Sequence, residues 1–115
     1  MRIISFTKMW DKLKQPEFTT FRFFRGDKDW YSGEEVQVFY KNRSQNREKL
    51  GTAEIINIEP RRILSSIPTD IPCVSDEEAR SDGFENFEDM KDWLNKTYGV
   101  VKLGNTINKI TLRWN

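Results

Sequence analysis

The stretch PEFTTFRFFR, residues 16–25, places two threonines, two arginines and four phenylalanines within ten positions. Successive side chains of a strand point to opposite faces, so we expect two mixed faces, one with Phe18, Thr20, Arg22 and Phe24 and the other with Thr19, Phe21, Phe23 and Arg25. One interpretation is an edge strand with a half-polar exposed face. The other is a strand that brings the hydroxyl of Thr20 and the guanidinium of Arg22 into a cleft, where both can bind a polar or anionic ligand.

The composition favours a single globular domain. Of the 115 residues, 37% are hydrophobic and 13% aromatic, which supplies a modest core and argues against disorder. Cys73 is the only cysteine, so no disulfide within the chain is predicted. The apolar run at the N-terminus is too short for a signal peptide or a membrane span. We therefore expect a soluble, cytoplasmic protein with no membrane partner.

The chain contains no histidine. Histidine is the commonest general base and the commonest metal ligand in proteins. Its absence excludes histidine-dependent triads and histidine-ligated zinc sites, and the sequence predicts no metal site and no cofactor.

The charge is distributed unevenly along the chain. Residues 1–62 carry 13 basic and 9 acidic side chains, whereas residues 63–115 carry 6 and 9. Basic residues gather in two segments, 22–28 and 40–50, and those of the second segment are Lys41, Arg43, Arg47 and Lys49. This loop could contact the phosphates of a nucleic acid. The alternative interpretation is a solvated hairpin tip.

The remaining strands are predicted from β-branched and alternating segments. We expect them at residues 2–6, 35–41, 51–60 and 106–114, with the second and third forming an antiparallel pair. A brief helix is expected within TKMWDKLKQ, with Thr7 as its N-cap and an end before Pro16.

Two helices are expected late in the chain. The first, SDEEARSDG, has Ser75 as N-cap, a capping box completed by Glu78, and Gly83 just past its end. The second, NFEDMKDWLNKTYG, is capped by Asn86 and terminated by Gly99. Its helically spaced apolar residues form a core face, widened by Trp93, and are Phe87, Met90, Leu94 and Tyr98.

This succession of elements predicts a fold of the α+β class that is mostly β. Five to six strands, two or three short helices and no regular strand–helix alternation favour a small, mostly antiparallel β-barrel or curled sheet. The helices would lie at one side or end of it.

The order of several motifs resembles the ASCH domain, a family with a PUA-like β-barrel. The motifs are EFTTFRFFR, WYSGEEVQV, LGTAEIINIE, ARSDGFENFEDMKDWLNKTYG and INKITLRW. The most specific part runs from Ala79 to Met90 and is followed by WL and YG. The resemblance covers nearly the whole chain and implies one ASCH/PUA-like domain across residues 1–115.

ASCH proteins usually carry a signature of the form G-x-K-x-x-T-x-R that leads into the cleft. Thr20 and Arg22 match its threonine and arginine, but Gln15 stands at the glycine position and Glu17 at the lysine position. Lysines 12 and 14 lie upstream and could supply the amine if the chain bulged.

The resemblance also implies candidate catalytic residues. Family members that act as acetylcytidine amidohydrolases use the lysine, the threonine as nucleophile and a later acidic residue, which corresponds here to Asp82. If the chain is an enzyme, its candidates are therefore Thr20, Asp82, Glu17 and Lys14. A threonine hydroxyl needs an adjacent base, and a desolvated lysine suits that role better than a carboxylate, so Glu17 disfavours catalysis.

As a binding site, the resemblance implies a cleft between the strand of Thr20 and Arg22 and the segment Asp82–Phe84. Arg22 would bind phosphate or a base edge, Asp82 would accept from an exocyclic amine, and Phe84 would either stack on a base or belong to the core. The expected ligand-binding residues, including those that extend the surface toward a nucleic-acid backbone, are Thr20, Arg22, Arg25, Lys28, Asp82, Phe84, Lys41, Arg43 and Arg47.

Three functions remain open at this point. The favoured one is a monomeric module that binds RNA or a nucleotide. The second is a small amidohydrolase acting on a modified nucleoside such as acetylcytidine. The third is a protein-interaction domain that uses the acidic stretch of residues 76–92.

Overall fold

The structure is a computed structural model of the 115-residue chain and describes all residues except 7–9, 24–27, 42–44, 46, 64–70 and 100–105. The described residues form five strands, one short 3-10 helix and two α-helices. In chain order these are β1 (Arg2–Phe6), η1 (Asp11–Lys14), β2 (Glu17–Phe23), β3 (Glu35–Tyr40), β4 (Glu48–Arg62), α1 (Asp76–Asp82), α2 (Phe87–Tyr98) and β5 (Thr106–Trp114). The expected α+β class with mostly β structure is confirmed.

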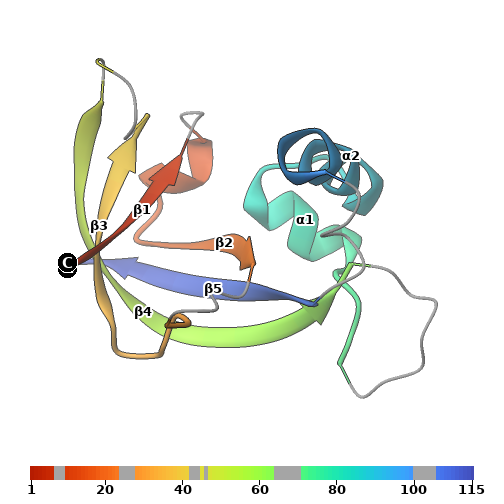
Figure 1. The fold of residues 1–115 in the computed structure, drawn as a ribbon, viewed down its shortest axis with the longest axis horizontal. Coiled ribbons are helices and arrows are strands. Elements are labelled where there is room, and N and C mark those ends of the chain that lie inside the picture. The colour runs from red at the N-terminus through yellow and green to blue at the C-terminus, as the bar shows by residue number, and fades with distance from the viewer. Residues whose placement is uncertain (7–9, 24–27, 42–44, 46, 64–70, 100–105) are drawn as a thin grey trace.

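All five strands form one sheet in the order β1-β3-β4-β5-β2, which curls into a half-barrel (Figure 1). The expected antiparallel arrangement holds for three of the four described strand pairings, but β1 departs from it because this strand pairs with β3 in parallel. A parallel pair needs a long crossover connection, and η1, β2 and the turn that follows provide it. β1 and β2 stand at the two ends of the strand order, so the described sheet is open between them.

β4 is a long strand that joins the two parts of the sheet. Its first half pairs with β3 and its second half with β5. The register shifts between Ile55 and Asn57, and a bulge of this kind bends a strand and increases its twist. β4 also continues beyond Pro60, where we expected the strand to end. Among the described residues, Pro60 pairs with Asn108 of β5 and has no strand partner on its other side, and such edge positions tolerate proline.

The buried side chains form two apolar clusters, and β2 contributes to both. The cluster inside the curl includes Phe18 of β2 and the side chains Ile4, Val36, Val38, Ile55, Ile110 and Leu112. The cluster between the sheet and the helices includes Phe21 of β2 and the side chains Ile63, Met90, Leu94 and Ile107. The phenylalanines of β2 thus pack on both faces, and Thr20 lies buried between them.

The ends of the two α-helices agree with the capping residues predicted from the sequence. In α1 the Ser75 side chain accepts a hydrogen bond from the Glu78 backbone, and Gly83 follows the helix with a left-handed φ of 111°. In α2 Asn86 caps the first turn and Gly99 ends the helix. No helix among the described residues has the length and apolar character that crossing a membrane requires.

Two helical expectations are met only in part. Met90 and Leu94 of α2 are buried and Phe87 and Trp93 are half-buried, whereas the side chain of Tyr98 lies outside the described part of the structure. The first helix is a single 3-10 turn preceded by Trp10. The predicted cap Thr7 lies outside the described residues.

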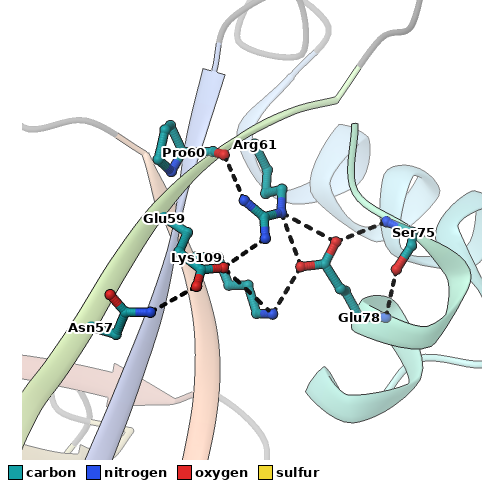
Figure 2. Close-up of polar contacts among 7 residues, drawn as sticks. All are labelled: Asn57, Glu59, Pro60, Arg61, Ser75, Glu78 and Lys109. Atoms are coloured by element: carbon teal, nitrogen blue, oxygen red, sulfur yellow. Dashed lines mark hydrogen bonds and ion pairs between the residues drawn. The ribbon is translucent and has the colours of Figure 1, made fainter. Parts of the chain in front are cut away.

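Glu78 ties α1 to β4 and β5 through a network of polar contacts (Figure 2). Its carboxylate binds the Arg61 guanidinium at 2.9 Å and the Lys109 ammonium at 2.8 Å, and it also accepts a hydrogen bond from the Ser75 backbone. Burial by itself would raise the pKa of Glu78, but the hydrogen bonds from Lys109, the Ser75 backbone and Arg61 together lower it below its ordinary value. The network positions the helix whose last residue reaches the candidate site.

Candidate functional site

A cavity of about 310 Å³ lies between the half-barrel and the two α-helices, and we call it the chamber. The rings on its wall belong to Phe6, Trp10, Phe21, Phe84 and Trp93. Its charged or hydroxyl-bearing side chains include Lys12, Thr20, Arg22 and Asp82. The chamber therefore draws residues from β1, η1, β2 and both helices, and it contains the three residues that the ASCH resemblance marks as a site.

Lys12 and Asp82 form a buried ion pair in the chamber. The Lys12 ammonium lies 2.6 Å from Asp82 Oδ1, and the two side chains are only 7% and 8% exposed. The ammonium also lies over the rings of Phe6 and Trp10, 5.1 and 5.7 Å from their centroids. A pair this deeply buried is expensive to desolvate, so it is weak evidence for a purely stabilising role.

Burial shifts the pKa values of both partners toward their neutral forms. Desolvation lowers the pKa of Lys12, although the neighbouring carboxylate of Asp82 opposes the shift. Desolvation likewise raises the pKa of Asp82 against the opposing effect of Lys12. Both shifts have the same cause, the removal of the two groups from water, and in each case the charge of the partner opposes the shift.

Arg22 bridges the two edge strands of the half-barrel, β1 and β2, next to the Lys12–Asp82 ion pair. Its guanidinium donates to the backbone carbonyl of Ser5 on β1 at 2.9 Å and lies over the ring of Phe6 at 5.0 Å. Its Nε donates to the hydroxyl oxygen of Thr20 at 3.2 Å. Arg22 thus connects the two edge strands and at the same time orients the buried Thr20 hydroxyl.

Three aromatic rings form a continuous wall on the helix side of the chamber. The Phe84 ring lies 5.2 Å from the Trp10 ring and 5.8 Å from the Trp93 ring. The sequence left open whether Phe84 belongs to a cleft or to the core. In the structure it does both, because it packs against the buried cluster under the helices and also lines the chamber.

Trp10 holds its place because residue 83 is a glycine. A Cβ at Gly83 would lie 2.5 Å from Trp10 Cε3, well inside contact distance. The left-handed φ of 111° at Gly83 also disfavours any other residue. The end of α1 and the wall of the chamber therefore depend on the same position.

The polar groups of the chamber retain unused hydrogen-bonding capacity. Asp82 Oδ2 has no hydrogen-bond partner among the described residues, whereas Oδ1 is bound by Lys12. The Thr20 oxygen accepts a hydrogen bond from Arg22, and its proton makes no hydrogen bond within the described part of the chain. The chamber can thus offer a ligand one acceptor and at least one donor between aromatic surfaces.

Of the two upstream lysines named in the sequence analysis, Lys12 lines the chamber. Glu17 and Lys14 do not line the chamber: Lys14 is 78% exposed beside Asp11, and Glu17 is exposed at the start of β2, where it borders a neighbouring pocket that Lys12 also touches. Residues 17 and 20 lie three apart in a regular strand and so point to opposite faces. The turn of η1 places Lys12 against Asp82, in the cavity that Thr20 also lines.

The other basic residues expected to bind a ligand lie elsewhere. Lys28 is exposed near Tyr31, Lys41 lies over the ring of Tyr40, and Arg47 over that of Phe39. None of these three lines the chamber. The expected residues Arg25 and Arg43 lie outside the described part of the structure.

The wall residues Phe6, Trp10 and Trp93 were not among the sequence candidates. Trp93 was assigned to the core by its helical spacing, and no sequence pattern distinguishes a core ring from a ring that lines a cavity. Within the described residues, no three histidine, cysteine, aspartate or glutamate side chains gather as a metal-binding group.

Comparisons with known proteins identify no relative. No protein-family model matches the chain, no curated protein matches it, and no solved structure matches it. The argument for a function therefore rests on the chamber itself.

Proposed function

We propose that the chamber binds a nucleobase and that the protein is a nucleotide- or RNA-binding domain of the ASCH type. The observation that carries the proposal is the buried Lys12–Asp82 pair within a cavity walled by aromatic rings. Ligand pockets typically combine such apolar walls with a few convergent polar groups, and volumes of about 300 Å³ lie at the small end of their range.

The aromatic wall suits a flat, unsaturated ring. Single bases are commonly recognised by stacking on aromatic side chains. Phe84 lies at the centre of the wall, between Trp10 and Trp93. This arrangement supports a planar ligand better than an extended aliphatic one.

The polar groups suit the edge of a base. Asp82 Oδ2 would accept from an exocyclic amine, and the Lys12 ammonium or the Thr20 hydroxyl would donate to a ring nitrogen or carbonyl. Thr20, Arg22 and Asp82, the residues implied by the ASCH resemblance, all line this one cavity. Their convergence and the curled sheet support a PUA-like domain.

The test is a titration with the four common ribonucleosides, followed by tryptophan fluorescence, because Trp10 and Trp93 line the chamber. We expect saturable binding of at least one nucleoside. Asp82→Asn should weaken it about 10- to 100-fold, the effect of a lost hydrogen bond to a charged group. Asp92→Asn, an exposed acidic position on α2, is the matched control and should bind normally. Absence of binding to all four nucleosides in the folded protein would refute the proposal.

A second candidate function is favoured by the position of Lys12. The chamber brings an amine, the Thr20 hydroxyl and the Asp82 carboxylate to one cavity, as an amidohydrolase of the ASCH type would need. With the proton of the pair on Asp82, the neutral Lys12 amine would take the Thr20 hydroxyl proton as Oγ1 attacks the acetyl carbonyl of an N-acetylated base. The amide C–N bond would then break and the nucleobase amine would leave with the proton from Lys12. Water would hydrolyse the threonine ester and release acetate.

Product analysis separates the two functions. Incubation with acetylcytidine should yield cytidine and acetate if the chamber is an active site, and Thr20→Ala should abolish the products while leaving the protein folded. Binding of acetylcytidine without products would reject the hydrolase and retain the binding domain.

A further inference from the structure

We propose that a second pocket beside the chamber binds a phosphate, so that the complete ligand is a phosphorylated nucleoside. This inference rests on the proposed function and names the ligand class of the same site. The second pocket has a volume of about 460 Å³ and lies against η1 and the end of α1.

The chamber and the second pocket are adjacent and have lining residues in common. Trp10, Lys12 and Phe84 line both of them. A ligand whose planar end stacks in the chamber can therefore extend past these side chains into the second pocket. The chamber is too small to enclose a base together with its sugar and phosphate, so the rest of the ligand needs an exit of this kind.

Arg80 supplies the charge that a phosphate requires. It lines the second pocket, and its Nε donates to the backbone carbonyl of Glu85 at 3.1 Å. Its two terminal nitrogens make no hydrogen bond or ion pair with the described residues. A guanidinium held at one nitrogen with a free pair of donors is suited to two oxygens of a phosphate.

Neutral donors complete the pocket. The amide of Gln15 and the hydroxyl of Ser81 line it and make no side-chain hydrogen bond within the described part of the chain. Asp11 is the acidic side chain on the wall, and the ammonium of Lys14 lies 3.8 Å from it and partly offsets its charge. The charge of Lys12 is offset by Asp82, so the donors that favour an anion here are the Arg80 guanidinium, the Gln15 amide and the Ser81 hydroxyl.

This placement differs from the one suggested by the sequence. The basic segment that includes Lys41 and Arg47 lines neither the chamber nor the second pocket. Arg80 lines the second pocket itself, whereas Arg22 lines the chamber and donates there to the Ser5 carbonyl and the Thr20 hydroxyl. Arg80 was not among the residues expected to bind a ligand.

The experiment compares each nucleoside that binds with its 5′- and 3′-monophosphates, using the wild-type protein, Arg80→Gln and the matched control Arg47→Gln. We expect one monophosphate to bind about tenfold more tightly than its nucleoside, as one exposed charge-assisted contact would give. Arg80→Gln should remove this advantage and leave nucleoside affinity unchanged. Arg47→Gln should preserve the advantage, and Arg80→Lys should restore part of it.

The phosphate could belong to a free nucleotide or to an RNA chain, so a trinucleotide is titrated alongside the monophosphates. Dependence on Arg80 in either ligand supports the proposal, and the tighter ligand identifies the source. If nucleosides bind but phosphate adds no affinity, or if Arg80→Gln leaves the advantage intact, this inference fails and the nucleobase proposal stands. If neither nucleosides nor nucleotides bind, both fail.

Discussion

Two carboxylates one helical turn apart on α1 contrast in how fully they are bonded. Glu78 is saturated: its Oε1 and Oε2 together accept from the Arg61 guanidinium, the Lys109 ammonium and the Ser75 backbone (Figure 2). Asp82, at the end of the same helix, accepts a hydrogen bond at Oδ1 from Lys12 and also feels the charge of Arg22, but its Oδ2 has no hydrogen bond among the described residues.

The contrast separates a carboxylate that anchors a helix from one that has an acceptor left for a ligand. Every strong acceptor site of Glu78 is used within the protein, so it holds α1 on the sheet and has little left for a ligand. Asp82 lies at a cavity with unused capacity, where a ligand can supply the missing hydrogen bond. A buried carboxylate that lines a cavity and keeps an unused hydrogen-bond acceptor therefore indicates a candidate site better than burial or charge alone.

The largest expected effect comes from breaking the buried pair. Lys12→Met should destabilise the fold by about 3–5 kcal/mol, because it leaves Asp82 buried without its charged partner. The double variant Lys12→Met/Asp82→Leu should regain most of that loss, since two apolar residues avoid the desolvation cost. Urea unfolding measures both. Lys14→Met is the control and should change stability by less than about 0.5 kcal/mol, because that side chain is exposed.

Equal stability of Lys12→Met and Lys14→Met would contradict the buried ion pair. It would also remove the distinction between the two carboxylates, because Asp82 would then tolerate the loss of its partner.

The next effect tests the chamber wall beside Asp82. Gly83→Ala should cost about 2–4 kcal/mol, because it combines a left-handed backbone with a collision against Trp10. Gly99→Ala is the matched control: its φ is also positive, at 85°, but a Cβ there meets nothing within 4 Å. We expect a shifted tryptophan emission and weakened nucleoside binding only in Gly83→Ala. The same emission change in both variants would show that Trp10 does not depend on Gly83.

The smallest effect concerns the saturated carboxylate. Glu78→Gln should cost about 1.5–3 kcal/mol at neutral pH, since it weakens hydrogen bonds to charged groups, and it should leave nucleoside affinity unchanged. The lowered pKa of Glu78 means that the unfolded state binds its proton first as the pH falls. Its stabilisation is thus complete above pH 4.5 and is lost as the pH falls through the lower, folded pKa.

Acid unfolding curves check this sign. The wild type should lose stability more steeply than Glu78→Gln as the pH falls below 4.5. Parallel curves would show that the network does not hold Glu78 in its charged form. A loss of nucleoside binding in Glu78→Gln would show that Glu78, like Asp82, contributes to the site, against the distinction drawn here.

Local features were predictable from the sequence because they depend on neighbouring residues. The capping box of Ser75 and Glu78 and the glycine stops at residues 83 and 99 are interactions within a few positions of the chain, and the structure has them where expected. The parallel pairing of β1 with β3 was missed, because strand partners are chosen by the whole sheet and not by either strand.

Part of the lining of the chamber was anticipated from the sequence, although not from local patterns. Thr20, Arg22 and Asp82 were identified through a family resemblance, and they do line one cavity. Lys12 was named only as an upstream lysine, because linear spacing to Thr20 pointed to position 17. Arg80 carried no signal, since an exposed arginine on a helix is ordinary until a pocket forms beside it.

By itself, the sequence determined a small, mostly β domain without histidine chemistry, the ends of its two α-helices and the mixed character of β2. These follow from composition, alternation and capping, which act over short stretches of chain. Only the tertiary structure decided that Lys12 meets Asp82 and that Arg22 connects the two edge strands. Such contacts join residues far apart in the chain, and their energies depend on a burial that exists only after the sheet has curled and the helices have packed.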